Sequence, residues 1–210
     1  DFFIPTEKLN GATDGDRVVA RLVKWDKSDK KPQAEVVTVI HAEDEADMAM
    51  KEILIDAGFP LQFETEVLKE AAKLSEKITR EEISKRKDCR DILTFTIDPA
   101  DAKDFDDAIS IRNLDNGNYE IGVHIADVSH FIKHDSILDK AAYKRATSVY
   151  LPDRVNPMLP ERISNELCSL RPNEDKYTFS VIFQITNRAE IKHKWIGRTL
   201  IHSNHRFTYE

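Results

Sequence analysis

The sequence predicts an α+β fold, because three successive segments differ in their hydrophobic periodicity. Residues 1–41 carry short alternating runs typical of strands, residues 43–90 place apolar side chains at helical spacing, and residues 91–210 mix both patterns. The chain has 210 residues, of which 40% are hydrophobic and 33% charged. Such a chain is long enough to bury a substantial core in one large domain or two smaller ones.

The first segment is predicted to be β structure. Strand patterns occur at 2–4, 17–23 and 34–40, with a turn at Asp14-Gly15 and a polar hairpin connection at 24–32. Three short strands cannot close a barrel alone, although they can complete one whose other strands precede them. A simple β meander is the alternative.

The second segment is predicted to be a helical connector. Apolar residues recur at helical spacing over 45–57 and 66–78, and Gly58 stands where the first helix would end. The run Thr79-Arg80-Glu81-Glu82 has the form of a capping box for a short third helix. Its charged residues indicate solvated faces and no chemistry.

The third segment alternates strands with short helices. Asn116-Gly117 is a hairpin signal, and the prolines of 151–160 predict an ordered extended loop. Predicted strands are 93–97, 108–112, 119–126, 128–133, 176–185 and 191–196; predicted helices are 136–145, 161–167 with Pro160 as its first residue, and one that starts at 206–210.

Composition limits the classes of protein that fit. The formal net charge is −7, which argues against a dedicated polycation but not against a local basic channel. Cys89 and Cys168 fit no metal or redox spacing, so reduced thiols in a cytoplasmic protein are expected. No run reaches the length of a membrane span, and no signal peptide opens the chain. The chain ends inside apparent elements, so we expect an internal segment of a longer protein.

An acidic loop is the most informative feature of the sequence. Five aspartates fall within ten residues between two predicted strands: Asp98, Asp101, Asp104, Asp106 and Asp107. Clustered carboxylates repel and raise one another's pKa, so a cation is needed to offset their charge. A hard divalent ion such as Mg2+ or Mn2+ matches the oxygen ligands.

Three interpretations of this loop fit a cluster of acidic residues. An EF-hand is excluded, because its positions 3, 5, 6 and 12 would be alanine, alanine, Lys103 and Ile109. A merely solvated acidic loop remains an alternative, although the flanking strands argue against it. The remaining hypothesis is a carboxylate site for one or two Mg2+ ions that act on phosphate esters. Asp101 is the expected solvent-facing bystander.

Other candidates are weaker. His124, Asp127 and His130 are spaced by three, but the surrounding pattern is a strand, so His124 is more simply a core histidine than a metal ligand. Trp195 lies among basic residues and is a candidate for stacking on a base, with a buried strand tryptophan as the alternative.

Four motifs resemble the RNase II/RNase R (RNB) exoribonucleases. The first is Ile97-Asp98-Pro99-Ala100-Asp101-Ala102-Lys103-Asp104-Phe105-Asp106-Asp107-Ala108. The others span 122–129 (GVHIADVS), 148–152 (SVYLP) and 157–170 (PMLPERISNELCSL), in the family's order and spacing. Residues 1–19 are similar to the second cold-shock domain of the RNase R branch.

The resemblance implies a domain arrangement. Residues 1–42 would be the C-terminal half of an OB-fold cold-shock barrel, 43–90 a helical connector, and 91–210 the N-terminal part of the mixed α/β RNB catalytic domain. The remaining domains of the family, together with a downstream arginine and glutamate, are not in this chain. This segment alone is therefore expected to lack activity.

The resemblance also implies an activity and its residues. Family members hydrolyse single-stranded RNA processively from the 3′ end to nucleoside 5′-monophosphates with Mg2+, for which Mn2+ is an alternative. Asp98, Asp104, Asp106 and Asp107 would be metal ligands, and Asp106 would also be catalytic. Tyr150 would pack on RNA near its 3′ end, and Trp195 is a second RNA-binding candidate.

The expected partner is single-stranded RNA, and no membrane or small-molecule cofactor is expected. The protein is expected to be monomeric and cytoplasmic. The alternative function is a non-catalytic RNA-binding module or degenerate relative.

Overall fold

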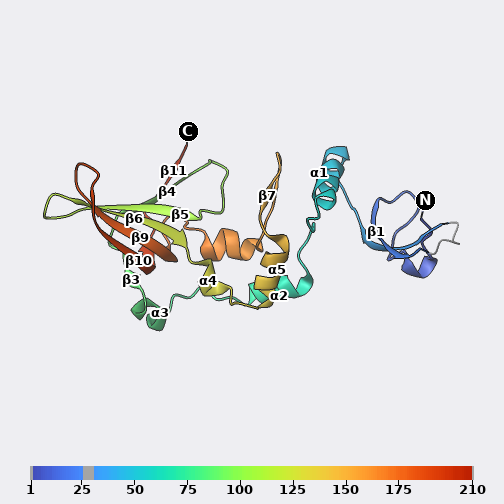
Figure 1. Ribbon diagram of the computed structural model, residues 1–210, viewed down its shortest axis with the longest axis horizontal. Helices are drawn as coiled ribbons and strands as arrows, with labels where there is room; N and C mark the ends of the chain where they lie inside the picture. The colour runs from blue at the N-terminus through green and yellow to red at the C-terminus, as the bar shows by residue number, and fades with distance from the viewer. Residues whose placement is uncertain (1, 26–30, 210) are drawn as a thin grey trace. The chain divides into compact units, whose positions relative to one another are not determined.

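The computed structural model describes residues 2–25 and 31–209. Contacts divide the chain into two compact units, Asp1–Gln62 and Phe63–Glu210 (Figure 1). Each unit combines strands with helices, so the predicted α+β class is confirmed.

The first unit contains a two-stranded antiparallel sheet. Strand β1 (Val18–Lys24) pairs with β2 (Gln33–Val39), and Ala34 and Val36 of β2 are buried. The strand predicted at 2–4 is reduced to a single bridge between Phe3 and Gln33, followed by the 3-10 turn η1 (Thr6–Lys8). Most of the predicted connection at 24–32 lies outside the described residues.

Helix α1 (Glu45–Asp56) completes this unit, and its C-terminal end follows the signal predicted at Gly58. The Asp44 side chain accepts a hydrogen bond from the backbone N–H of Asp47, which satisfies one free donor of the first turn. Ala57 is the C-cap of the helix, and Gly58 follows with φ of +80°, a conformation that favours glycine.

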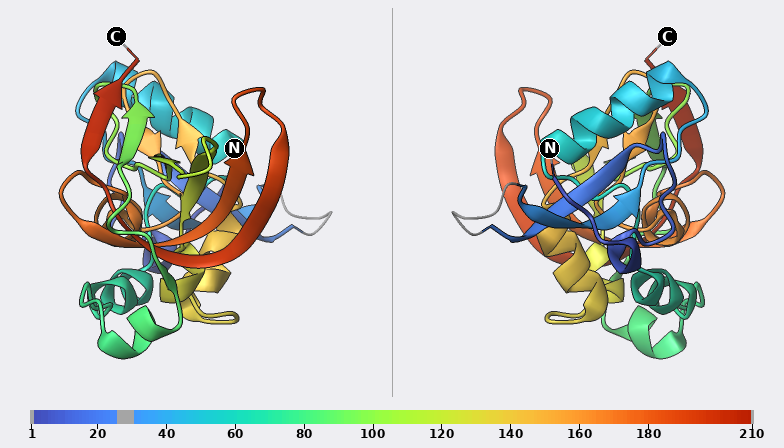
Figure 2. Two further views of the ribbon diagram at one scale, coloured as in Figure 1. Left: turned by 90° about the vertical axis from the view of Figure 1, so that its left-hand side faces the viewer. Right: turned by 90° about the vertical axis from the view of Figure 1, so that its right-hand side faces the viewer.

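The second unit is built on a seven-stranded sheet in the order β11-β4-β5-β6-β9-β10-β3 (Figure 1). Neighbouring strands are antiparallel except for the parallel pairs β11–β4 and β10–β3. Figure 2 shows β11 beside β4 and the long curved hairpin of β9 and β10. The bounds are β3 (Lys87–Asp88), β4 (Thr94–Asp98), β5 (Asp107–Asn113), β6 (Tyr119–Ala126), β9 (Asp175–Ile185), β10 (Ile191–His202) and β11 (His205–Thr208).

Short helices and a small hairpin accompany this sheet. The helices are α2 (Thr65–Ala72), α3 (Arg80–Ser84), α4 (Val128–Phe131), α5 (Ile137–Arg145) and the π-helix η2 (Arg162–Cys168); the hairpin pairs β7 (Val149–Tyr150) with β8 (Val155–Asn156). Half of the capping box predicted at α3 is formed: Thr79 accepts from Glu82 N–H, but Thr79 N–H donates to the Tyr177 hydroxyl instead of to Glu82. Ser136, at which no cap was predicted, caps α5 by accepting from Asp139 N–H.

Three local predictions were wrong. Residues 128–133 form helix α4 instead of a strand, and the helix predicted at 206–210 is strand β11. The helix predicted at 66–78 ends at Ala72, because Arg162 contacts the Leu74 carbonyl and Glu76, and Tyr177 accepts from Thr79 N–H. These long-range contacts hold the segment after α2 extended.

One face of the large sheet lies against the core, where Ile163, Leu170 and Ile201 are completely buried. Its inner face also has a polar row in which Gly122 is required, because a Cβ there would collide with Ser110 Oγ and His124. On the outer face of β5, β6 and β9, apolar side chains are exposed: Ile109, Val123, Ile125 and Phe179. No helix in the described part of the chain combines the length and apolar character that crossing a bilayer requires.

Candidate metal site

The acidic loop connects β4 to β5 and begins and ends on aspartates of the sheet. Asp98 is the last residue of β4, and Asp107 is the first residue of β5. The two strands pair only at Thr94–Ser110 and Phe95–Ile109, so they have separated where the loop starts. The aspartates are therefore gathered at one edge of the sheet, as the flanking strand patterns predicted.

Backbone hydrogen bonds fix the second half of the loop. Leu170 N–H donates to the Phe105 carbonyl at 2.9 Å, and Ala126 N–H donates to the Asp106 carbonyl at 2.9 Å. The Phe105 side chain is buried in the core. The loop is thus an ordered part of the fold rather than a freely solvated acidic segment.

Arg206 on β11 fixes the first half. Its Nη2 donates to the carbonyls of Pro99 and Ala100 at 2.8 and 2.7 Å, and its guanidinium lies 4.8 Å from the centre of the Phe105 ring. The sequence pattern did not identify Arg206, because its contacts span more than 100 residues.

Asp98 is the most buried of the candidate ligands, with 9% of its surface exposed. Its Oδ2 atom is buried and has no hydrogen-bond partner among the described residues. Burial raises the pKa of Asp98, and the charges of Asp107 and Asp104 add to this effect, whereas the nearby Thr96 hydroxyl and the charge of Arg206 oppose it. An unpartnered buried carboxylate oxygen is what a hard cation would satisfy.

Asp106 is an exposed residue, yet the surrounding protein removes part of the water around its carboxyl. The loss of water around it raises its pKa, and the charges of Asp104, Asp107 and Asp98 raise it further. Every resolved influence on this carboxyl therefore disfavours its charged form. Asp101 is exposed, in agreement with its predicted place in solvent.

The four candidate carboxylates share an electrostatic environment but do not form a closed cage. In residues 2–25 and 31–209, the group of three potential ligands within 4.8 Å of one another is His134, Asp135 and Asp139. That group lies next to α5, with His134 and Asp135 exposed. An ion at the loop would need further oxygens, as Mg2+ commonly takes from water and phosphate.

The structure brings Tyr150 to this loop and places Trp195 elsewhere. The Tyr150 hydroxyl donates to Asp104 Oδ2 over a long distance of 3.4 Å. Desolvation, together with the charges of Asp104 and Asp106, raises the pKa of Tyr150. Tyr150 as a residue remains 69% exposed on the β7–β8 hairpin. Trp195 instead packs against the core cluster, with the Lys87 ammonium 5.0 Å from its ring centre.

The hairpin that carries Tyr150 is attached to α5 by a buried arginine. Arg145 Nη1 donates to Asn156 Oδ1 at 3.0 Å and to the Pro157 carbonyl at 3.1 Å, and its guanidinium lies 3.8 Å from the Phe63 ring centre. Burial lowers the pKa of Arg145. This residue gave no signal in the sequence.

His124 is a core histidine, as its strand context predicted. It is completely buried on β6, where its two ring nitrogens contact Ser180 Oγ at 2.6 Å and Ser110 Oγ at 2.8 Å. Burial lowers the pKa of His124 to about 4. Its neighbours in these contacts are hydroxyl groups, so nothing suggests a transition-metal site.

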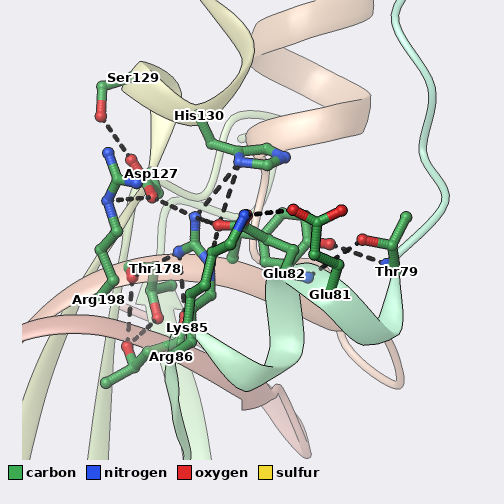
Figure 3. A network of polar contacts seen from close by, with 12 residues as sticks. Thr79, Glu81, Glu82, Lys85, Arg86, Asp127, Ser129, His130, Thr178 and Arg198 are labelled. Carbon is green, nitrogen blue, oxygen red and sulfur yellow. Dashed lines mark hydrogen bonds and ion pairs between the residues drawn. The ribbon is translucent and has the colours of Figure 1, made fainter.

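A second carboxylate site, which the sequence did not reveal, follows β6 (Figure 3). Arg86 Nη2 lies 2.7 Å from Asp127 Oδ2 and 2.8 Å from Glu82 Oε1, and its side chain is completely buried. Ser129 donates to Asp127 Oδ1 at 2.7 Å, and Arg198 Nε lies 3.7 Å from Oδ2. Burial raises the pKa of Asp127, but Ser129 and Arg86 more than offset that effect and lower it overall.

Comparison with known protein families identifies the class to which this fold and acidic loop belong. The family model of the RNB domain matches residues 86–210, and that of a cold shock domain matches residues 1–64. The chain belongs to the RNB family, which confirms the resemblance drawn from its motifs.

Several relatives carry the names of ribonucleases. Ribonuclease R of Thermotoga maritima is 42% identical over all of this chain, which covers 30% of that protein. DIS3-like exonuclease 2 of Xenopus tropicalis is 53% identical over 63% of this chain, which covers 14% of that protein. The chain thus spans about a third or less of the length of these relatives.

Solved structures share the fold. Mycoplasma genitalium RNase R in complex with ribose-methylated single-stranded RNA has a TM-score of 0.84 and 29% identity, over 99% of this chain and 32% of that chain. Yeast Ssd1, a pseudonuclease, has a TM-score of 0.71 over 99% of this chain and 27% of its own, at 24% identity. The Ssd1 likeness concerns the fold alone.

Proposed function

We propose that this chain is the metal-binding part of a processive 3′→5′ exoribonuclease that degrades single-stranded RNA to nucleoside 5′-monophosphates. The observation that carries this proposal is the ordered acidic loop, in which Asp98 has a buried oxygen without a partner. RNB family membership and relatives named Ribonuclease R support the same activity.

Asp98, Asp104, Asp106 and Asp107 are the proposed ligands of Mg2+, with Mn2+ as a substitute. A divalent ion held there would supply activation of a water molecule and neutralisation of charge on the phosphodiester. Asp106 is the proposed catalytic residue of this set, since its carboxylate is accessible from solvent and close to the charges of the other three. The ligand set still requires oxygens from outside the loop, a role that RNA phosphate would fill.

Tyr150 is the proposed contact for RNA next to the metal. Its exposed ring can stack on a base while its hydroxyl faces Asp104, which would place the 3′ end beside the loop. The same role for Trp195 is less well supported, because its ring packs against the core. The complete protein is proposed to act as a cytoplasmic monomer.

We further propose the division 1–42, 43–90 and 91–210 for the cold-shock part, the connector and the catalytic part. Limited proteolysis of the full protein tests these boundaries, since cleavage should concentrate in the connector.

The decisive experiment replaces Asp106 with Asn in the full-length protein. Hydrolysis of end-labelled single-stranded RNA should fall by about 10²–10³-fold, because a charge that acts on the reacting phosphate is lost. Binding of the RNA should persist. Asp101→Asn is the matched control, since it removes an exposed charge from the same loop and should leave the rate unchanged.

Hydrolysis that survives Asp106→Asn unaltered would show that the catalytic assignment is wrong. A wild-type protein that binds RNA and does not hydrolyse it would instead support the non-catalytic RNA-binding alternative.

A further inference from the structure

The motif that ends η2 contains a serine whose position the proposed activity does not explain. Ser169 is the first residue after the π-helix Arg162–Cys168 and is completely buried. π-Helical turns are rare and often occur at functional sites. The π-helix η2 leads the chain from Cys168 to Leu170 beside the acidic loop, where Leu170 N–H donates to the Phe105 carbonyl.

The Ser169 hydroxyl bonds the backbone on both sides of Asp104. Its Oγ accepts from Phe105 N–H at 3.0 Å and donates to the Lys103 carbonyl at 2.8 Å. One hydroxyl can donate and accept at once, so a single side chain satisfies both groups. Asp104 is therefore held between two fixed peptide groups, while its side chain accepts one long hydrogen bond, from the Tyr150 hydroxyl.

We infer that Ser169 is a positioning residue for the metal ligands, which sets the backbone of Asp104 and, through Phe105, of Asp106. From 103 to 106, the loop backbone is bonded to Ser169, to Leu170 and to Ala126, which belong to two distant segments. Carboxylates on so restrained a backbone present their oxygens in a constant arrangement. Groups that orient metal ligands in this way typically change metal affinity about 10–100-fold when removed.

The role inferred for Ser169 rests on the proposed metal site, and the test separates the two. Ser169→Ala removes the hydroxyl and leaves the Lys103 carbonyl and Phe105 N–H without a partner. The Mn2+ dissociation constant of the full chain, measured by calorimetry at a temperature where circular dichroism shows the variant folded, should rise about 10–100-fold.

Ser203→Ala is the matched control. Ser203 is also completely buried, and its hydroxyl has no hydrogen-bond partner in the described part of the chain. Its replacement should leave the Mn2+ dissociation constant within about twofold, because no bond to the loop is lost. The dissociation constant and not the melting temperature is compared, because replacing any completely buried serine can lower the melting temperature.

A Ser169→Ala variant that folds and binds Mn2+ as tightly as the wild type would overturn the inference. A wild-type protein that binds no Mn2+, either alone or with single-stranded RNA present, would overturn the metal site itself. If Ser169→Ala does not fold, Ser169→Cys keeps a side chain of similar shape with only a weak donor and acceptor. It should also weaken Mn2+ binding, and wild-type affinity in that variant would count against the inference.

Discussion

Two buried carboxylates in the second unit, Asp127 and Asp98, have charges with opposite surroundings. Asp127 is buried beside Arg86, with Arg198 and the Ser129 hydroxyl completing its surroundings (Figure 3). Asp98 is buried with a free oxygen and has other aspartates near it. The pKa of Asp127 is lowered, whereas that of Asp98 is raised. The difference separates a carboxylate whose charge the fold neutralises with arginines from one that we propose as a ligand of an external cation.

The two sites are connected through one strand. Ala126, the last residue of β6, bonds the carbonyl of Asp106, and the next residue, Asp127, donates its N–H to the Tyr177 carbonyl. The neutralised site therefore anchors the strand end against which the acidic loop rests. Groups held on rigid, well-packed elements keep a constant geometry, so this strand end supports the arrangement of the acidic loop.

The largest effect is expected at the compensated site. Arg86→Met should lower the free energy of unfolding by about 3–5 kcal/mol, because it leaves Asp127 and Glu82 charged without their shared partner. Urea denaturation at neutral pH measures this change. Lys73→Met is the control, since Lys73 is exposed and pairs with Glu70 on the surface, so its loss should have little effect. Similar stability in the two variants would mean that Arg86 does not neutralise Asp127.

His124 shows a third way in which the fold accommodates a buried titratable group, since its ring stays neutral. Its pKa in the folded chain is about 4, below the ordinary value of 6.5. The unfolded chain therefore binds the extra proton first, so stability is fully present above pH 6.5 and is lost as the pH falls toward 4, by about 3 kcal/mol.

Urea denaturation at pH 7 and pH 4.5 measures how the free energy of unfolding changes with pH in the wild type and in His124→Gln. The variant should lack the part of this change that His124 causes. His134→Gln, at an exposed position, should leave the slope unchanged. An identical slope in the wild type and His124→Gln would refute the assignment.

The uncompensated site should respond with the opposite sign to the compensated one. Asp98→Asn should raise the free energy of unfolding without divalent ions by about 0.5–2 kcal/mol, a typical gain when an unfavourable functional group is replaced. The same change should abolish the stabilisation by Mn2+ that the wild type is expected to show. Thermal unfolding with and without Mn2+ measures both effects.

Asp101→Asn, in the same loop but exposed, should change neither quantity appreciably. If Asp98→Asn destabilised the metal-free protein, Asp98 would be compensated after all, and the contrast with Asp127 would fail.

Local patterns were sufficient wherever neighbouring residues decide the structure. Alternation predicted β6 at 119–126 with its observed bounds, and the caps at Thr79 and Gly58 marked the ends of two helices. They failed where distant segments decide: residues 205–208 are a strand because β4 pairs with them, and the segment after Ala72 is extended because Arg162 and Tyr177 contact it.

By itself, the sequence determined the α+β class, the family motifs and the concentration of negative charge between β4 and β5, since each depends on residues close together in the chain. Only the tertiary structure decided which carboxylates are neutralised. Arg86 is 41 residues from Asp127, Ser169 is 66 from Lys103, and Arg206 is 107 from Pro99. Desolvation and compensation depend on what lies next to a charge in space, and folding brings those neighbours together.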